Sequence, residues 1–253
     1  RIASLAPSVR SHFGSRLWAF FSPHGQLGIA AMSSSEFAEP IRIACIGDSV
    51  TEGTGLSDPM ADSYPVQLAA FLRAHGYPSV EVRNFGQGGA GVLKRGCNPF
   101  WDTDQYGDAL AFDPDVLVVL LGTNDSRREF WGNDPAASLH ARERILASLA
   151  DDEENDAPVH GELEFEQDLE ELVEIFGRML AEPQIFLCTP VPVFHGNGWL
   201  DQEVLRTEIA PRIRCVAARH RLRAVELLDS SLAQRPDLFP DGVHPSAAGA
   251  GEV

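Results

Sequence analysis

Five short apolar segments, separated by stretches of helical or loop character, constrain the fold of this chain more than any other feature. Apolar runs of about four to eight residues bounded by turn residues are typical of buried strands. Strands that alternate with helices form parallel βαβ units with right-handed crossovers. We therefore predict a three-layer α/β/α fold around a five-stranded parallel sheet of flavodoxin-like order 2-1-3-4-5. The predicted strands are Ile41–Ile46, Val80–Arg83, Val116–Leu121, Ile185–Cys188 and Ala224–Leu228.

Three segments between these strands have helical periodicity. The first has Ser63 as a candidate N-cap, Pro65 in its first turn and Gly76 as its stop. The second carries apolar residues at helical spacing from Phe165 to Leu180 and an acidic opposite face, and the third runs from about Asp201 to His220.

The composition predicts one catalytic-size domain over residues 38–253, because 253 residues with 44% hydrophobic content can bury one sizeable core. Residues 1–37 are expected to be an unstructured extension. No acid occurs before Glu36, whereas eight serines and three arginines do, as in an organellar transit peptide or translated upstream sequence. The final SAAGAGEV resembles the start of a helix, which suggests a C-terminal truncation.

The net charge of -17 argues against a nucleic-acid partner, which requires Lys and Arg facing the phosphates. Thirteen acids against one base between Asp151 and Glu182 account for -12 of that charge, and DDEENDAPVHGE from Asp151 is expected to be a solvated insertion. The apolar runs are shorter than a membrane helix of about 20 residues, so we expect a soluble protein without a membrane span. No clear secretory signal is evident, so the compartment stays open, with the cytoplasm or an organelle as candidates, and the oligomeric state stays open as well. The four cysteines are expected to be thiols and not a disulfide framework.

Small polar residues gather where the predicted strands end. GDSVTEG follows the first strand, NFGQGGAG the second, GTNDS the third, and LFPDGVHPSAAG the fifth. Since parallel strands end on one edge of the sheet, and strand 1 lies between strands 2 and 3 in this order, the first three loops are expected to be neighbours.

These loops hold the groups that acyl transfer requires. Ser49 supplies a hydroxyl, His244 can take its proton, and Asp241, three residues earlier, can orient the imidazole. The negative charge that develops on an ester oxygen needs donors, and the candidates are the backbone N–H groups of Ser49 and Gly89 and the amide of Asn124.

The four blocks resemble those of the SGNH, or GDSL-type, hydrolases, and connecting segments such as SYPVQLAAFL and IFLCTPVPVF are similar to the branch associated with carbohydrate acyl esterases. The resemblance implies that Ser49 is the nucleophile, that His244 is the general base oriented by Asp241, and that Ser49, Gly89 and Asn124 form the oxyanion hole. It also implies an acyl-serine intermediate without a metal or organic cofactor. The expected substrate is a short acyl ester, acetyl first, of a carbohydrate or small molecule.

Other functions stay open. Lysophospholipids or short-chain lipid esters are alternative substrates for the same machinery. A metal-dependent phosphoesterase would use Asp48, Asp125, Asp241 and His244 as ligands, although we expect Asp48 and Asp125 to brace their loops through backbone groups. A carbohydrate-binding protein without catalysis is a third alternative.

Aromatic side chains near the predicted edge could stack on a sugar, and an interior or loop-packing role is equally open for each, namely Tyr64, Phe100, Trp101, Phe130, Trp131 and Trp199. Arg127 and Arg128 could contact a polar substrate or lie in solvent, and His195 is expected only to border the pocket. The pattern G-x-G-x-x-G at Gly86–Gly91 is not expected to bind a dinucleotide, because a Gly- and Pro-broken loop follows it where that motif opens a helix.

Overall fold

The computed structural model describes residues 19–21, 27–29, 40–127, 130–131, 161–194 and 200–253. The chain divides into two units, residues 1–39 and 40–253. In the first unit, β1 (Ala19–Phe21) pairs antiparallel with β2 (Leu27–Ile29). Our expectation of no regular structure before residue 38 is therefore corrected at this pair. Its sequence has a hairpin pattern, two apolar triplets on either side of a segment with Pro and Gly.

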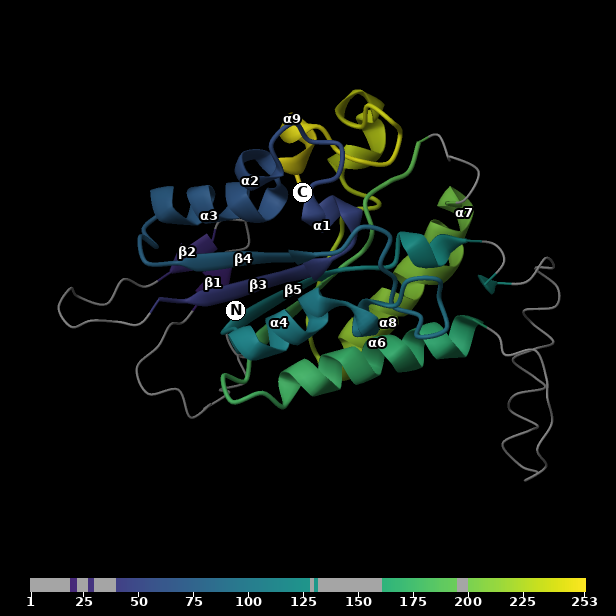
Figure 1. The fold of residues 1–253 in the computed structure, drawn as a ribbon, viewed down its shortest axis with the longest axis horizontal. Coiled ribbons are helices and arrows are strands. Elements are labelled where there is room, and N and C mark those ends of the chain that lie inside the picture. The colour runs from purple at the N-terminus through teal and green to yellow at the C-terminus, as the bar shows by residue number, and fades with distance from the viewer. Residues whose placement is uncertain (1–18, 22–26, 30–39, 128–129, 132–160, 195–199) are drawn as a thin grey trace, which may run out of the picture. The chain divides into compact units, whose positions relative to one another are not determined.

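The second unit contains the predicted parallel sheet. Its strand order is β4-β3-β5-β6-β7, and each neighbouring pair is parallel. In chain order this is 2-1-3-4-5, so the predicted topology is confirmed (Figure 1). The strands are β3 (Arg42–Gly47), β4 (Glu81–Gly86), β5 (Val116–Leu120), β6 (Gln184–Cys188) and β7 (Arg223–Val225).

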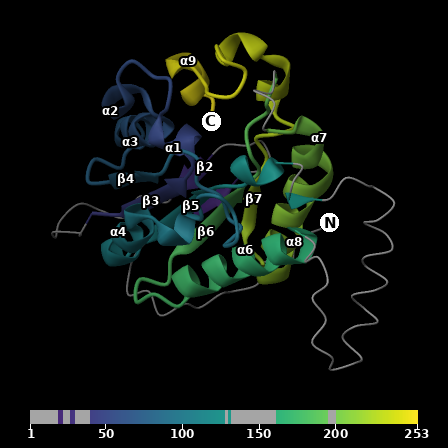
Figure 2. The same ribbon diagram turned by 45° about the vertical axis from the view of Figure 1, so that its right-hand side comes forward.

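Helices cover both faces of this sheet, which gives the three expected layers (Figures 1 and 2). One face carries α1 (Ser49–Glu52), α2 (Pro59–Asp62), α3 (Tyr64–Ala74) and α9 (Ala247–Ala250). The other carries α4 (Asp104–Phe112), α6 (Gly161–Gly177) and α8 (Ala210–His220). Each face has its own cluster of buried apolar side chains.

Two predicted helices differ in detail from the observed ones. The helix expected to reach Leu180 ends at Gly177, and the Leu180 side chain is 98% exposed although it continues the apolar spacing. The helix expected over 201–220 contains α7 (Gln202–Val204), a π-helical turn over Leu205–Ile209, and α8. Pro211 follows the π turn, and it has no N–H with which to continue the regular ladder.

The last strand is shorter than predicted, because beyond it the backbone N–H groups bond to the side chain of Thr189 and not to the backbone of β6. β7 ends at Val225, and the backbone N–H groups of Leu227 and Leu228 donate to Thr189 Oγ1 at 2.9 and 3.1 Å. Residues 151–160 of the acidic insertion lie outside the described residues, and α6 begins at Gly161.

α1 approaches the ends of β3 and β4 so closely that two glycines are required there. A Cβ atom on Gly47 would lie 1.9 Å from Thr51 Oγ1 and 2.6 Å from the carbonyl oxygen of Leu120. A Cβ atom on Gly86 would lie 2.1 Å from the backbone nitrogen of Glu52. Because backbone atoms cannot rotate away as a side-chain end can, Gly86 fixes the distance between β4 and α1.

We expect Gly86→Ala to lower the free energy of unfolding by about 1–3 kcal/mol, because the added methyl group must displace the backbone of α1. Gly107→Ala is the matched control. Gly107 lies inside α4, where an added Cβ atom would meet no neighbour within 4 Å, and alanine is favoured over glycine in a helix by about 0.5–1 kcal/mol. Urea unfolding of both variants would test this, and equal destabilisation of the two would contradict it.

Candidate active site

Ser49 is the first residue of α1 and closely follows the strand β3. Asp48 caps this helix, since its Oδ1 accepts a hydrogen bond from the backbone N–H of Val50 at 2.9 Å. Gly53 ends the helix in the left-handed region at φ 95°, where glycine is favoured. The apolar run before Asp48 is therefore the buried strand, and the small polar residues after it form a tight turn that presents the Ser49 hydroxyl at the sheet edge.

His244 and Asp241 reach Ser49 from the C-terminal segment. His244 Nε2 lies 2.9 Å from Ser49 Oγ, and His244 Nδ1 lies 2.6 Å from Asp241 Oδ2. An ionised carboxylate can only accept, so Nδ1 carries the hydrogen and Nε2 is left to accept from the serine hydroxyl. The structure thus brings together the three residues that the sequence predicted as a triad.

Asp241 also fixes the backbone of its own loop. Its Oδ1 accepts from the backbone N–H groups of Val243 and His244, at 2.9 and 2.7 Å. Partial burial opposes ionisation, but the hydrogen bonds from the His244 side chain and from these two N–H groups lower the pKa of Asp241 below its ordinary value. Asp241 therefore remains an anion that can orient the imidazole.

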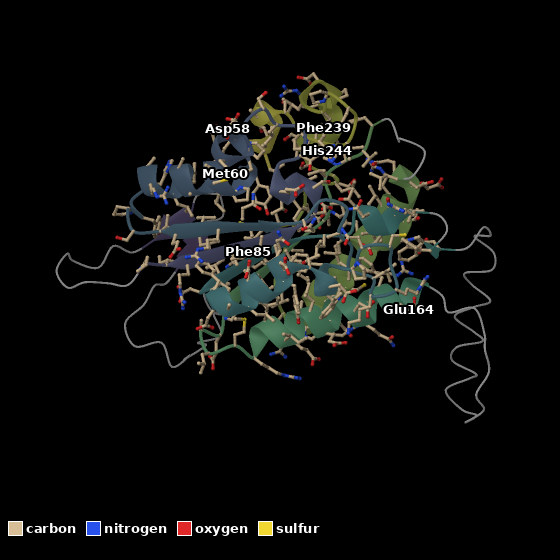
Figure 3. All side chains as sticks on the ribbon, viewed as in Figure 1. Asp58, Met60, Phe85, Glu164, Phe239 and His244 are labelled. Atoms are coloured by element: carbon tan, nitrogen blue, oxygen red, sulfur yellow. The ribbon has the colours of Figure 1, made fainter. Side chains whose placement is uncertain are left out.

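The C-terminal segment is anchored to the rest of the unit around His244. The backbone N–H of Phe194 donates to the carbonyl of Gly242 at 2.8 Å, and Gln67 on α3 donates to the carbonyl of Ala247 at 2.8 Å. Figure 3 shows His244 and Phe239 in this segment above α1. The turn after α1 also lies close to His244, since a Cβ atom on Gly55 would lie 3.5 Å from His244 Cβ.

Gly89, in the loop after β4, and Asn124, in the loop after β5, lie next to each other. Strand pairing sets Gly47 opposite both Gly86 and Leu120, so the loops after β3, β4 and β5 start at the same level. Gly89 has φ 77°, and Asn124 Nδ2 donates to the carbonyl of Ala90 at 2.9 Å, next to Gly89. That bond uses one of the two amide hydrogens of Asn124. Gly89 and Asn124, two of the three predicted oxyanion donors, are thus neighbours.

Asp125 ties these two loops to each other. Its Oδ2 and Oδ1 accept from the backbone N–H groups of Val92 and Leu93 at 2.9 and 2.8 Å, and its own carbonyl accepts from Trp131 Nε1 at 2.6 Å. The expectation that Asp48 and Asp125 bond to backbone groups agrees with this geometry. In each case the carboxylate holds a segment that carries a candidate catalytic residue.

Both carboxylates are buried, and the burial has an electrostatic cost. Asp48 is 0% exposed and Asp125 is 1% exposed. Burial raises the pKa of each to about 6, against the opposing effect of their hydrogen bonds. Asp48 Oδ2 has no hydrogen-bond partner among the described residues.

A small hollow opens beside the proposed oxyanion donors. Its volume of about 220 Å³ includes space that is open to solvent, so it is a shallow depression and not an enclosed pocket. It is lined by Gly89, Gly91, Gly96, Cys97, Asn98, Asn124, Asp125, Arg127 and Phe130. Sequence reasoning named Gly89, Asn124, Asp125, Arg127 and Phe130 but missed Cys97 and Asn98, which come from a loop without a recognisable motif.

Most aromatic side chains expected near the edge have other roles. Tyr64 and Phe100 are buried, at 6% and 0% exposure, and Trp101 Nε1 donates to the carbonyl of Val92 at 2.9 Å. Phe130 lines the hollow. The candidates Arg128, His195 and Trp199 lie outside the described residues.

The hypothetical metal ligands are engaged in other bonds. Asp125 accepts from two backbone N–H groups, and Asp241 holds His244. Within the described residues, no group of three or more His, Cys, Asp or Glu side chains is placed to hold a metal ion. The segment after Gly86–Gly91 opens no helix in the described structure.

This arrangement, a serine paired with an oriented histidine at the end of the first strand of a parallel sheet, is one that ester hydrolases use. A model of the GDSL-like lipase/acylhydrolase family matches residues 45–251. The chain belongs to this family, and the resemblance inferred from the four sequence blocks is confirmed.

Two kinds of relative extend this comparison. An acetylxylan esterase of Xylanibacter ruminicola is 32% identical over 229 residues, covering 84% of this chain and 41% of that protein, so the chain spans about two fifths of its length. A two-domain esterase active on acetylated mannans, crystallised with mannopentaose, has a TM-score of 0.55 and 19% identity, covering 85% of this chain and 47% of that one. A catalytic mutant of an acetylxylan esterase from Geobacillus stearothermophilus has a TM-score of 0.57 and 19% identity over 85% and 91% of the two chains. The solved structures share the fold with this chain.

Among the helices of the described residues, none has the length and apolar character needed to cross a membrane.

We expect Asp48→Asn to remove a pH-dependent loss of stability. With the pKa of Asp48 raised to about 6, the folded state keeps a proton that the unfolded chain releases, so the wild-type protein loses stability as the pH rises from about 4 to about 7. Asparagine keeps an oxygen for the Val50 N–H but carries no charge. The unfolding free energy of the variant minus that of the wild type should therefore increase by up to about 3 kcal/mol from about pH 4.5 to about pH 7.5.

Asp58→Asn is the matched control for this measurement, made by denaturant unfolding at both pH values. Asp58 is exposed and caps α2 through the same kind of bond, from Met60 N–H to Asp58 Oδ1 at 3.1 Å (Figure 3). An equally large pH-dependent difference in the control would show that burial of Asp48 is not the cause.

Proposed function

We propose that this chain is a serine esterase that removes short acyl groups, acetyl first, from carbohydrate esters through an acyl-serine intermediate. The observation that carries the proposal is the unbroken hydrogen-bond chain from Asp241 through His244 to the Ser49 hydroxyl. A serine hydroxyl is a weak nucleophile unless a base takes its proton, and this chain supplies an oriented base.

The chemistry then follows from the placement of these groups. Ser49 Oγ attacks the ester carbonyl while His244 Nε2 takes its proton, and the imidazolium that forms is stabilised by the Asp241 carboxylate. His244 next gives this proton to the leaving alcohol, so that an acyl group stays on Ser49. In the second half, His244 takes a proton from water, the hydroxide attacks the acyl carbon, and Ser49 leaves with the proton returned by His244.

The negative charge on the carbonyl oxygen needs preplaced donors. The backbone N–H of Ser49 lies at the start of α1, and Gly89 and Asn124 both line the small hollow. The hydrogen bonds from the loop after β4 to Asp125 hold Gly89 and Asn124 in fixed positions relative to each other. Losing one such donor typically costs about 100- to 1000-fold in rate, which is why a site of this kind requires a rigid frame.

The choice of substrate has two supports. A relative with 32% identity over 84% of this chain is named an acetylxylan esterase, and the first solved structure cited above is of an esterase active on acetylated mannans. The hollow beside Gly89 and Asn124 is small and carries polar groups with one aromatic wall. A small site of this composition favours a short acyl group on a polar alcohol over a long fatty chain.

A serine-directed phosphonate is expected to inactivate the wild-type protein and to label Ser49, because His244 activates only this hydroxyl. Ser49→Ala should resist labelling and lose at least about 1000-fold of the hydrolysis rate of p-nitrophenyl acetate. Peptide mapping of the labelled protein gives the position. Ser246→Ala is a control in the same region, since that hydroxyl caps α9. Label on another residue, or full activity in Ser49→Ala, would refute the assignment.

The substrate class is tested by acetate release from acetylated xylo-oligosaccharides and acetylated manno-oligosaccharides, and by hydrolysis of lysophosphatidylcholine and of p-nitrophenyl esters of increasing acyl length. We expect the sugar acetates to be cleaved and p-nitrophenyl acetate to be preferred to the butyrate by at least about tenfold, since one or two methylenes are worth about 10- to 200-fold in a fitted pocket. Preference for lysophosphatidylcholine or for longer acyl chains would favour a lipid esterase instead.

A further inference from the structure

The helix that begins at Ser49 is a single turn, so its position depends on its contacts with the rest of the folded unit. α1 contains four residues, Ser49–Glu52, whereas isolated helices shorter than about 12 residues are marginal in water. The carbonyl groups in the last turn of a helix also have no partner within the helix. Contacts with the C-terminal half of α1 therefore fix where the Ser49 hydroxyl lies relative to the other groups of the site.

Asn84, on β4, makes such a contact. Its Nδ2 donates to the carbonyl of Thr51 at 2.6 Å and lies 3.4 Å from Ser63 Oγ. Asn84 lies on an edge strand and is exposed as a whole, but Thr51 and Ser63 are both 0% exposed, so its amide nitrogen bonds to buried residues. The Tyr64 hydroxyl lies 3.3 Å from Thr51 Oγ1, which holds the same residue of α1 at a second point.

The other end of the same amide holds the loop that contains Gly89. Asn84 Oδ1 accepts from the backbone N–H of Gly86 at 2.9 Å. A turn over residues 87–90 follows, closed by the N–H of Ala90, which donates to the carbonyl of Gln87 at 3.0 Å. Gly89 is the third residue of this turn and has φ 77°. A closed turn leaves little freedom between Gly86 and Gly89, so the bond at Gly86 also fixes the Gly89 N–H.

An amide is the side-chain group that can make both bonds. The Gly86 N–H can only donate and the Thr51 carbonyl can only accept, so the Asn84 oxygen must face Gly86 and its nitrogen must face Thr51. An ionised carboxylate would accept at both ends, and an apolar side chain would bond at neither. Because the amide group is planar and rigid, the two bonds set the distance between α1 and the start of the loop after β4 (Figure 1).

We propose that Asn84 is a positioning residue for the reaction, which holds Ser49 and the candidate oxyanion donor Gly89 at the separation that the tetrahedral intermediate requires. This inference rests on the proposed function and deepens it. In the intermediate, the oxyanion and Ser49 Oγ are bonded to the same carbon atom, so a donor to that oxyanion must lie at a set distance from Oγ. Asp125 joins the loops of Gly89 and Asn124 to each other, and Asn84 joins the Gly89 loop to the serine.

Asn84→Asp tests this with a nearly unchanged shape. The variant keeps the acceptor for the Gly86 N–H but places an oxygen against the Thr51 carbonyl, so α1 and the Gly89 loop should move apart. Acylation and deacylation both form an oxyanion, so we expect kcat for p-nitrophenyl acetate to fall about 10- to 100-fold, the cost of a displacement of about 1 Å. KM should stay within about twofold of the wild-type value, because the interaction lost is made in the transition state.

Two measurements separate this effect from a loss of folded protein. The serine-directed phosphonate counts the active sites in each preparation, and kcat is expressed per labelled site, so a partly unfolded variant still gives a valid value. The rate constant for inactivation by the phosphonate should also fall, because the phosphonyl oxygen occupies the same oxyanion hole. Asn84→Ala, which loses both bonds, should show the same lower kcat per site.

Arg73→Met is the matched control. Arg73, on α3, donates to the carbonyl of Val80 at 3.1 Å, directly before β4. This side chain therefore also joins a helix to the segment of β4, but at the end of the strand opposite to Ser49. Its loss should leave kcat per labelled site at the wild-type value, whatever its effect on the free energy of unfolding.

The other outcomes decide against the inference. Wild-type kcat per site in both Asn84 variants would overturn it, and labelling of Ser49 with ester hydrolysis by the wild type would then leave the proposed function standing. A loss seen only in KM would assign Asn84 to substrate binding instead. An equal fall of kcat in Arg73→Met would show that loosening β4 anywhere is sufficient. A wild-type protein that neither hydrolyses p-nitrophenyl acetate nor is labelled at Ser49 would refute the proposed function, and the inference with it.

Discussion

The hydrogen bond between Ser49 and His244 is the contact on which the candidate site depends, and it joins residues 195 positions apart. Its length of 2.9 Å requires α1 to lie close against the ends of β3 and β4, where Gly47 and Gly86 leave no room for a side chain. It equally requires the C-terminal segment to pack over α1, through the bonds that Phe194 and Gln67 make to that segment. The geometry of the site is therefore set by packing on both sides of the bond and not by the serine turn alone.

Two buried carboxylates hold the frame around this bond. Asp48 fixes the start of the serine helix, and Asp125 joins the loops of Gly89 and Asn124. Charged groups without contact with water are costly, and the raised pKa of both shows the direction of that cost. Neutral side chains would remove the charge, but an amide in place of Asp125 would turn a donor toward one of the two N–H groups that it now accepts from. Burial of Asp48 and Asp125 thus lowers the stability of the fold, while their hydrogen bonds hold the candidate oxyanion donors close together.

The sequence was sufficient for the sheet order, since strands that alternate with helices leave few topologies. It was also sufficient to predict that Ser49, Asp241 and His244 lie together, because each stands beside turn-forming neighbours. It misplaced what depends on tertiary contacts. The spacing of Leu180 continues a helix that Gly177 ends, and β7 is cut short because Thr189 bonds to Leu227 and Leu228. Cys97 and Asn98 could not be found from a motif, because a loop brings them to the hollow only after folding.

The candidate triad is divided between the two ends of the folded unit, and this division has a consequence for how the proposed activity would be lost. Ser49 follows a strand inside the sheet, whereas Asp241 and His244 belong to a segment with short 3₁₀ turns and the four-residue α9. Although Leu238, Phe239 and Val243 of this segment are buried, a segment outside the central strands can open at a lower free energy than those strands. Release of this segment alone would silence catalysis while the sheet stayed intact, so heat inactivation would precede loss of secondary structure. The time for which the protein stays active would then depend on how firmly the C-terminal segment packs against α1. Strengthening that contact would prolong activity without changing the temperature at which the sheet melts.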